Sequence, residues 1–547
     1  MMNKAYNLRV GWVFLFFCIA YVIIACNLFF IQVMRSDFFS SLGKQQYEVV
    51  LTLEPPRAAI MDRTGKQFLA LNKESVAAFI LPRQVHEPEK LAAFLKKHFP
   101  AAYKRLGRHD DSYFIYVRRR LTPAHIELIN NSNLADIKLL NEPSRFYPIA
   151  SAAAIVGITD IDNKGLLGLE MQFNKQLAGE PMVSSLEKDA RSGHFYFDKK
   201  TKVAGTQGKP ITVTISSDLQ FLVSQELHEA IKKYDAKEGS VIVIDPSNGD
   251  ILAMASAPGF DPNDTADLDL ELTKNRVIAD AYELGSVFKV FAAMAALEEG
   301  VVTANDMIDC QGVETGSVDG RKINTVKSSI RGVIPFYEVI SVSNNIGIAQ
   351  VAHRVGNKMY DHYKRLGFGK KSGIALPGEH SGIVNHPNNW SKQSIFSLSY
   401  GYEVSATLLQ LARAFCLIAN DGYQIKPRLM LDAPIEKSSE RLYSHETIEV
   451  IRSILENTTV QGTAKKAAVK GYRVMSKTGT ANLLINGEYD TQRNLYTCAG
   501  IVERDGYQRV IVTFIREAHG YNLYASTVAA PLFEQVAQKM LIHEKII

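Results

Sequence analysis

The chain has 547 residues and a formal net charge of +5 at pH 7, and 46% of its residues are hydrophobic. This length favours two or three domains, and the composition is that of a globular protein with a real core. The charge is small for the size and no long basic run is present, so composition gives no support to a nucleic-acid partner. The five cysteines follow no CxxC or Cys/His spacing, which argues against a disulfide framework and a zinc site.

The first informative element is a stretch without charged residues from Val10 to Met34. Its 25 residues exceed the roughly 20 that a helix needs to cross a bilayer. Its length favours an uncleaved membrane anchor over a signal peptide. Lys4 and Arg9 precede it, and the positive-inside rule places such residues in the cytoplasm. We therefore expect a single-span protein whose remaining chain lies outside the cytoplasmic membrane.

The elements that follow are mixed. Residues 48–72 alternate apolar and polar around Pro55-Pro56 and predict strands and turns, whereas 88–107 and 123–131 predict helices. A polar linker candidate, DKKTKVAGTQGKP, leads to a strand at Ile211 and a helix that ends near Tyr234. Two strand pairs are expected, one around DPSNGD (239–256) and one around RDGYQ, and a last helix over 528–544. This order predicts one sheet with helices packed on its faces.

The spacing S-x-x-K occurs three times, but only Ser286 and Lys289 open a long apolar helical pattern. The simplest interpretation of Ser286 is a helix N-cap, yet a capping box would carry Glu or Gln where Lys289 stands. The helix macrodipole and burial both favour a neutral lysine in a first turn. A neutral amine one turn from a hydroxyl can act as the base that activates a serine nucleophile.

Two further motifs follow in the chain. Ser343-Asn344-Asn345 places a hydroxyl and an amide one residue apart, although alone it is as consistent with an ordinary turn. Lys477-Thr478-Gly479-Thr480 follows an apolar lead and is expected on a strand, where Gly479 would let a ligand approach the backbone. Its lysine and hydroxyls suit a carboxylate. The order S-x-x-K, S-x-N, K-T-G-T is typical of penicillin-binding proteins and class A β-lactamases.

With these motifs the sequence resembles the class B penicillin-binding proteins over nearly the whole chain after the anchor. PRAAIMDRTGKQFLA resembles the family's segment after the anchor, and the stretch from RFYP to Gly168 and Glu170 resembles its non-catalytic module. FIYVRRRLTPAHIELI and SLSYGYEVSATLLQLARAFCLIANDG are most similar to the FtsI-type member, which cross-links septal peptidoglycan. The elongation-type member is the close alternative.

The resemblance implies an α/β (α+β) fold. Residues 1–9 would form a cytoplasmic tail and 10–34 a transmembrane anchor. Residues 35–205 would form an elongated pedestal or dimerisation-type module. Residues 206–547 would form a transpeptidase domain whose central antiparallel sheet is flanked by helices. It also implies a single-pass protein of the bacterial inner membrane with a periplasmic catalytic domain, working at the septum with an FtsW-type polytopic glycosyltransferase and other division proteins.

The resemblance implies the roles of the site residues as well. Lys289 would take the proton of Ser286, which attacks a stem peptide ending in D-Ala-D-Ala, and Ser343 would relay the proton to the leaving amine. Asn345 would orient Lys289 and hold the peptide amide. The terminal carboxylate would be held by the third motif, comprising Lys477, Thr478, Gly479 and Thr480. A β-lactam would acylate the same serine, and no metal or organic cofactor is needed.

Three positions depart from the family pattern. Ala58 stands where glycine is usual, Leu284 replaces a proline, and Glu403 occupies the place of a small residue. Other functions remain open. A membrane-anchored β-lactamase shares the motifs, but it is usually one small secreted domain. A β-lactam sensor would need further spans or a cytoplasmic effector. A scaffold with a degenerate site is disfavoured by three intact motifs.

Overall fold

The computed structural model describes residues 2–107, 114–188 and 195–546, and its contacts divide the chain into two compact units. The first unit comprises Met1–Pro56 and Ala178–Gly208, and the second comprises Arg57–Leu177 and Lys209–Ile547. The functional boundary placed near residue 205 stays a prediction.

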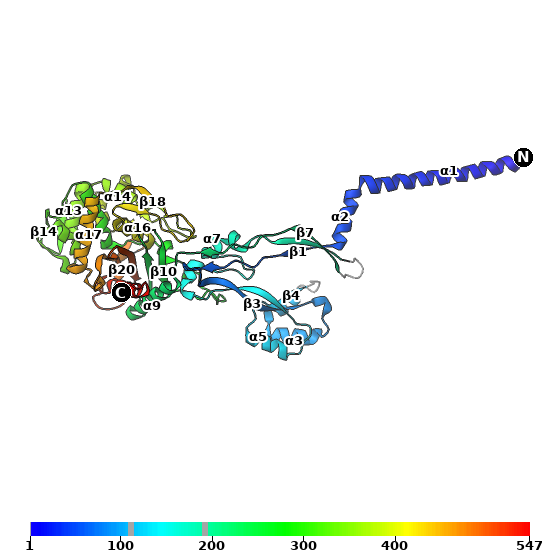
Figure 1. The fold of residues 1–547 in the computed structure, drawn as a ribbon, viewed down its shortest axis with the longest axis horizontal. Helices are drawn as coiled ribbons and strands as arrows, with labels where there is room; N and C mark the ends of the chain where they lie inside the picture. The colour runs from blue at the N-terminus through cyan, green and yellow to red at the C-terminus, as the bar shows by residue number, and fades with distance from the viewer. Residues whose placement is uncertain (1, 108–113, 189–194, 547) are drawn as a thin grey trace. The chain divides into compact units, whose positions relative to one another are not determined.

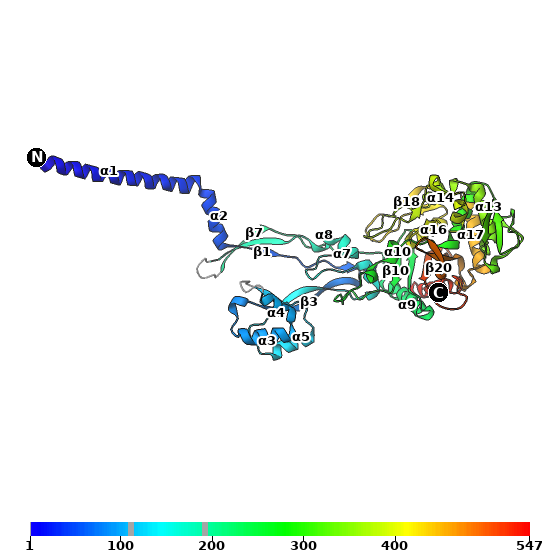
Figure 2. The same cartoon turned by 180° about the vertical axis from the view of Figure 1, so that it is seen from behind.

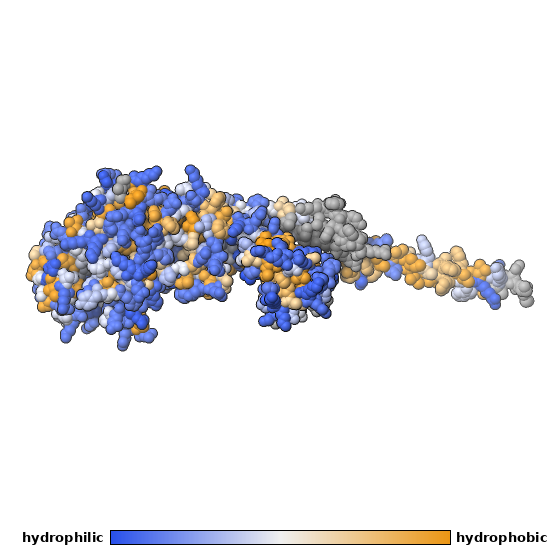
Figure 3. Space-filling view, turned by 90° about the horizontal axis from the view of Figure 1, so that it is seen from below, coloured by the Kyte–Doolittle hydropathy of each residue, from blue (hydrophilic) through white to orange (hydrophobic). Residues whose placement is uncertain are grey.

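The first unit begins with the uncharged segment, which forms one helix from α1 (Met2–Phe29) through a short π-helical turn, η1 (Phe30–Met34). The span Tyr6–Met34 is long and apolar enough to cross a membrane, and none of it is buried. Figure 3 shows its surface as a nearly continuous apolar stretch. The unit continues with helix α2 (Ser36–Tyr47) and a three-stranded sheet in the order β1 (Glu48–Leu53), β6 (Met182–Lys188) and β7 (Phe195–Val203).

The N-terminal part of the second unit is organised around the long strand β3 (Phe68–Ile80). β3 pairs with β5 (Lys138–Phe146) and, at its end, with the edge strand β4 (Ile115–Arg118). Its start pairs with β2 (Ile60–Met61), which in turn pairs with β8 (Ile211–Thr212). Helices α3 (Pro88–His98), α4 (Pro100–Leu106) and α5 (Pro123–Asn131) lie beside β3 (Figure 2), and α4 contacts β4. The helix predicted over 88–107 is divided, because Phe99 precedes a proline and leaves the helical conformation.

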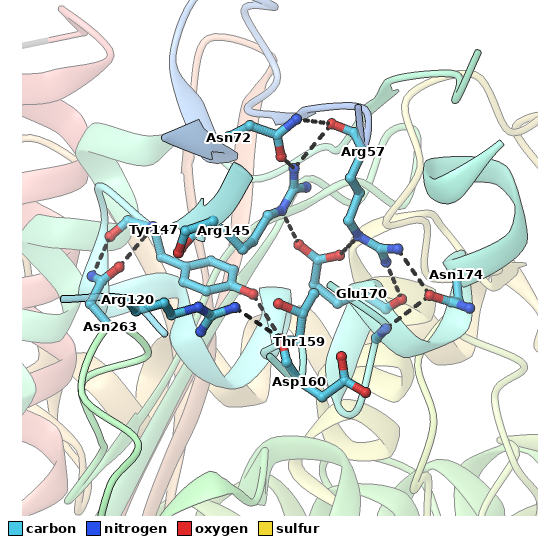
Figure 4. A network of polar contacts seen from close by, with 12 residues as sticks. Arg57, Asn72, Arg120, Arg145, Tyr147, Thr159, Asp160, Glu170, Asn174 and Asn263 are labelled. Carbon is cyan, nitrogen blue, oxygen red and sulfur yellow. Dashed lines mark hydrogen bonds and ion pairs between the residues drawn. The ribbon is translucent and has the colours of Figure 1, made fainter. Parts of the chain in front are cut away.

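A buried polar network holds this module together (Figure 4). Glu170, on helix α7 (Gly168–Gln172), has no exposed surface and accepts from Arg57 Nε and Arg145 Nε, each at 2.6 Å. Tyr147 lies two residues after Arg145. Its N–H donates to Asn263 Oδ1 at 3.0 Å, and its carbonyl accepts from Asn263 Nδ2 at 2.8 Å. The segment around Arg57 and the segment from Arg145 to Glu170 therefore meet in one network. Tyr147 links the second segment to Asn263, in the part of the chain that carries the three motifs.

The C-terminal part of the second unit, Lys209–Ile547, contains a five-stranded antiparallel sheet in the order β10-β9-β21-β20-β19. The two strand pairs predicted around DPSNGD and RDGYQ are confirmed. Alternate residues of β9 face opposite cores: Val241 and Val243 lie in one hydrophobic cluster, and Ile242 and Ile244 in the other. The strands are β9 (Glu238–Ile244), β10 (Ile251–Ala257), β19 (Arg473–Ile485), β20 (Glu488–Arg504) and β21 (Tyr507–Arg516).

Helices cover both faces of this sheet (Figure 1). One face packs against α9 (Ser217–Tyr234) and α18 (Ala529–His543), which confirms the predicted last helix. The other face packs against α16 (Leu408–Ala419) and α17 (His445–Val460), with α11 (Lys289–Glu298) beside them. The predicted mixed fold with a central antiparallel sheet is confirmed, and Cys310, Cys416 and Cys498 are free thiols buried in the structure.

Further helices and short paired strands complete the fold. The helices are α6 (Ala153–Val156), α8 (Asn174–Ala178), α10 (Arg276–Ala279), α12 (Phe336–Ser341), α13 (Asn345–Val355), α14 (Lys358–Arg365) and α15 (Ser394–Ser399). Short strands pair as β11 (Met307–Asp309) with β14 (Val333–Pro335), β12 (Thr315–Val318) with β13 (Arg321–Asn324), β15 (Ile383–Val384) with β16 (Val404–Ser405), and β17 (Tyr423–Ile425) with β18 (Lys437–Arg441).

Candidate active site

Ser286 lies in the short 3-10 turn η5 (Gly285–Phe288) that leads into α11. Its hydroxyl caps neither helix, since the N-cap positions are Leu284 for η5 and Phe288 for α11. Instead, Ser286 Oγ lies 2.9 Å from Lys289 Nζ. Gly285 has a φ of +58°, and a Cβ there would approach the Thr480 carbonyl to 2.8 Å. The turn is therefore held directly against strand β19.

Lys289 is fully buried and makes three polar contacts. Its Nζ donates to the Ser343 carbonyl at 2.8 Å and lies 3.0 Å from Ser343 Oγ, in addition to its contact with Ser286. Burial, and then the nearby charge of Lys477, hold the pKa of Lys289 well below the usual value for lysine. A carbonyl can only accept a hydrogen bond, so a neutral amine that donates to it keeps its lone pair for one of the two hydroxyls.

Ser343 is placed by a tight connection between α12 and α13. Its φ is +64°, and the following Asn344 caps α13 by accepting from Gly347 N at 2.8 Å. Lys477 Nζ lies 3.0 Å from Ser343 Oγ and donates to the Thr478 carbonyl at 2.9 Å. Lys477 is also fully buried, which lowers its pKa to about 7. Two hydroxyls and two amines, drawn from three distant segments, therefore form one connected chain.

Asn345 lies at the edge of this group. It is the first residue of α13, and its Nδ2 donates to the Asn324 carbonyl at 2.7 Å. Within the described parts of the chain, no hydrogen bond joins it to Lys289. The Ser343 carbonyl instead takes the orienting position that was expected for Asn345.

The third motif lies on β19, as predicted, and β19 is an edge strand of the sheet. The Thr478 hydroxyl donates to Thr463 Oγ1 at 3.0 Å, and Thr480 Oγ1 accepts from Ala525 N at 2.9 Å. A Cβ at Gly479 would lie 2.4 Å from the Leu284 carbonyl, so only glycine lets β19 approach the η5 turn, which carries Ser286, this closely. The free edge of β19 offers backbone groups to an extended peptide.

Sequence reasoning missed several supporting residues. Gly401 has a φ of +87°, and a Cβ there would lie 2.1 Å from the Gly285 carbonyl. This glycine therefore packs directly against the η5 turn. Tyr402 Oη accepts from Asn482 N, just beyond the third motif, at 3.2 Å. In the sequence, the run YGYE supports the family resemblance and contains the unusual Glu403, but it predicts no contact of Gly401 or Tyr402 with the site. Nothing in the local sequence distinguishes Thr463, which reaches the site through the turn after α17.

Comparison with known proteins agrees with this geometry. The model of the penicillin binding protein transpeptidase domain matches residues 239–538, which contain all three motifs, and the penicillin-binding protein dimerisation domain matches residues 52–213. The chain belongs to the class B penicillin-binding proteins. This confirms the family resemblance, and the family is one of serine-type acyltransferases.

Individual members of the family are similar along almost their whole length. Stage V sporulation protein D of Bacillus subtilis is 30% identical over 98% of this chain and 86% of its own. Peptidoglycan D,D-transpeptidase FtsI of Escherichia coli is 28% identical over 96% of this chain and 90% of its own. The crystal structure of penicillin binding protein 3 from Mycobacterium tuberculosis, complexed with aztreonam, has a TM-score of 0.67 at 26% identity. The match covers 91% of this chain and 98% of the chain in that crystal structure.

Proposed function

We propose that this class B penicillin-binding protein is a septal peptidoglycan D,D-transpeptidase that works through an acyl-enzyme on Ser286. The observation that carries the proposal is the contact of 2.9 Å between Ser286 Oγ and Lys289 Nζ, in a site where the pKa of the amine is strongly lowered. A positioned neutral base typically contributes about 100- to 10,000-fold to a rate. The similarity to an FtsI protein supports the septal role.

Acylation begins when the stem peptide lies along the free edge of β19. Lys289 takes the proton of Ser286, and Oγ attacks the carbonyl carbon of the penultimate D-Ala. The N–H groups of Ser286 and Thr480 bind the oxygen that becomes negative, and loss of one such donor typically costs about 100- to 1000-fold in rate. The peptide bond then breaks, and Ser343, which lies between the two amines, passes a proton to the nitrogen of the departing D-Ala.

The third motif and Asn345 hold the substrate. Lys477 with the hydroxyls of Thr478 and Thr480 binds the terminal carboxylate, whose charge favours the protonated form of a lysine with a pKa of about 7. The side-chain amide of Asn345 binds the peptide backbone. A side-chain amine of a second stem then attacks the ester carbonyl, Ser286 recovers its proton, and the cross-link is formed. A β-lactam follows the first half of this route and stays on the serine.

The apolar helix α1 supports a single-pass anchor in the inner membrane, with the remaining chain in the periplasm. Residues 35–205 form, on this proposal, the pedestal that contacts an FtsW-type glycosyltransferase and other division proteins. They hold the catalytic domain where glycan strands emerge.

The decisive experiment uses the full-length protein in detergent and a fluorescent penicillin. We expect stable labelling of the wild type and of Ser41→Ala, in which another serine of the same S-x-x-K spacing is removed. Ser286→Ala should remain unlabelled. Labelling of Ser286→Ala would overturn the assignment of the nucleophile, and rapid loss of label from the wild type would identify a β-lactamase instead.

The cellular role is tested separately, by depletion of the protein in living cells. A septal enzyme should give filaments, because growth continues while division stops. Round cells would assign the protein to elongation, and the chemistry proposed at Ser286 would be unaffected.

A further inference from the structure

A second cavity adjoins the proposed active site, and the mechanism above does not use it. Its volume is about 460 Å³. It lies between the segment that leads to Ser286, the β15–β16 ribbon and the end of β19 beyond the third motif. The residues that matter here are Glu283, Asn385, Glu403, Asn482, Leu484 and Arg516.

The direction of the substrate places part of the stem peptide beside this cavity. The terminal carboxylate binds near Lys477 and Thr478, and the reacting carbonyl lies near Thr480, so residues that precede the D-Ala pair continue toward Asn482. There the free edge of the strand ends, because Asn482 N–H donates to Tyr402 Oη at 3.2 Å. The peptide must leave the strand edge at this point, and its next side chain comes to the mouth of the cavity.

Among the described residues that line this cavity, Glu403 carries the one carboxylate with no hydrogen bond or ion pair. Its side chain makes no hydrogen bond and no ion pair with any residue that the structure describes, and it is only half-buried. The other two charged groups each have partners, although the Oε2 atom of Glu283 is buried and has none. Glu283 Oε1 accepts from Glu403 N at 2.7 Å and from Tyr489 Oη at 3.2 Å, and Arg516 pairs with Glu238 at 2.9 Å.

The backbone holds Glu403 in this position. Its φ is +58°, in the left-handed region that favours glycine, and its N–H is fixed by Glu283. Glycine would adopt this backbone conformation more readily, so the glutamate brings a charge that the turn itself does not need. Cross-linking consumes a side-chain amine of the acceptor stem, and donor and acceptor stems have the same chemistry. A donor stem therefore carries the same amine, on the diamino residue before its D-Ala pair.

We propose that Glu403 binds the side-chain ammonium of the donor stem's diamino residue, and that the enzyme thereby selects donors whose amine is still free. This inference rests on the proposed function, because it takes the peptide direction from the proposed roles of Lys477 and Thr480. A donor already cross-linked through its amine has lost that positive charge and forms no ion pair with Glu403. Release of the departing D-Ala and the attack on the ester carbonyl are unchanged by this contact.

The test compares two synthetic pentapeptides that end in D-Ala-D-Ala and carry lysine at the third position, one with a free Nε amine and one with an acetylated amine. The rate at which each acylates the full-length enzyme is measured by competition with a fluorescent penicillin. We expect the wild type to prefer the free amine about tenfold, and high salt to reduce the preference because the ion pair is half-exposed. Glu403→Gln and Glu403→Gly should both lose the preference. Glu403→Gly also keeps the left-handed turn, so it guards against a folding defect.

Glu440→Gln, which removes an exposed carboxylate elsewhere, should keep the wild-type preference. Equal rates for the two peptides on the wild type would overturn the inference, and so would a preference that survives in both Glu403 variants. If fluorescent penicillin still labels Ser286 in those experiments, the transpeptidase assignment stands and only the role of Glu403 fails. If Ser286 is not labelled at all, the proposed function itself has failed.

Discussion

Replacement of Lys477 by methionine should stabilise the protein at neutral pH although it abolishes the proposed carboxylate site. Lys477 is fully buried, and its pKa falls from the ordinary 10.5 to about 7. At pH 7 this shift costs the folded state about 4 kcal/mol, at about 1.4 kcal/mol per pKa unit, because about half of the buried amine is still protonated there. Methionine has a similar volume and no charge to desolvate, but it leaves Ser343 Oγ and the Thr478 carbonyl without one partner each. Those losses cost about 1 to 3 kcal/mol together, so we expect a net gain of about 2 kcal/mol.

The stability of the wild type depends on pH because Lys477 has different pKa values in the folded and unfolded states. Between about pH 7 and 10.5 the unfolded chain holds the proton of Lys477 and the folded chain does not, so wild-type stability rises with pH through this window. The cost of Lys477 shrinks to about 2 kcal/mol at pH 9, where it is offset by the lost hydrogen bonds, so Lys477→Met should be about as stable as the wild type.

The assay is thermal unfolding of the full-length protein in detergent at pH 7 and pH 9. The melting temperature of Lys477→Met should exceed that of the wild type by about 3 °C at pH 7 and be about equal to it at pH 9. Lys466→Met, which removes an exposed lysine, should show no such pH dependence. An equal difference between variant and wild type at both pH values would refute the reasoning, because the buried amine would then not be neutral.

Three other changes test the remaining structure. Lys289→Arg should slow acylation by fluorescent penicillin at least about 100-fold, because a guanidinium stays protonated and cannot act as a base; a rate within threefold of the wild type would contradict this. Glu170→Gln should lower the free energy of unfolding by about 3 kcal/mol, measured by denaturant titration, since two buried arginines lose their shared carboxylate; an unchanged midpoint would mean that the network contributes little. Gly401→Ala should slow acylation and lower the melting temperature, because its Cβ would lie 2.1 Å from the Gly285 carbonyl; wild-type kinetics would show that the turn can move without cost.

Local patterns were enough to predict most of the elements. The uncharged N-terminal stretch predicted a helix long enough to span a membrane, and the hairpins around DPSNGD and RDGYQ formed where turn residues separate apolar runs. The helix over 123–131 also formed as predicted, with Thr122 as its cap. Long-range packing and strand pairing are less visible in sequence, and β8 accordingly kept only two residues of the longer strand expected from Ile211.

The sequence by itself was enough to predict the family, and it also determined that Ser286 and Lys289, the proposed nucleophile and base, lie together, because they are one helical turn apart and local geometry alone brings them into contact. The tertiary structure decided what holds the amine in place. Ser343, 54 residues from Lys289, contributes a carbonyl in that role, whereas Asn345 turns to Asn324. It also decided that three segments meet so closely that Gly285, Gly401 and Gly479 admit no side chain. Such contacts join residues far apart in the chain, and the free energy that selects them comes from packing, which no local pattern records.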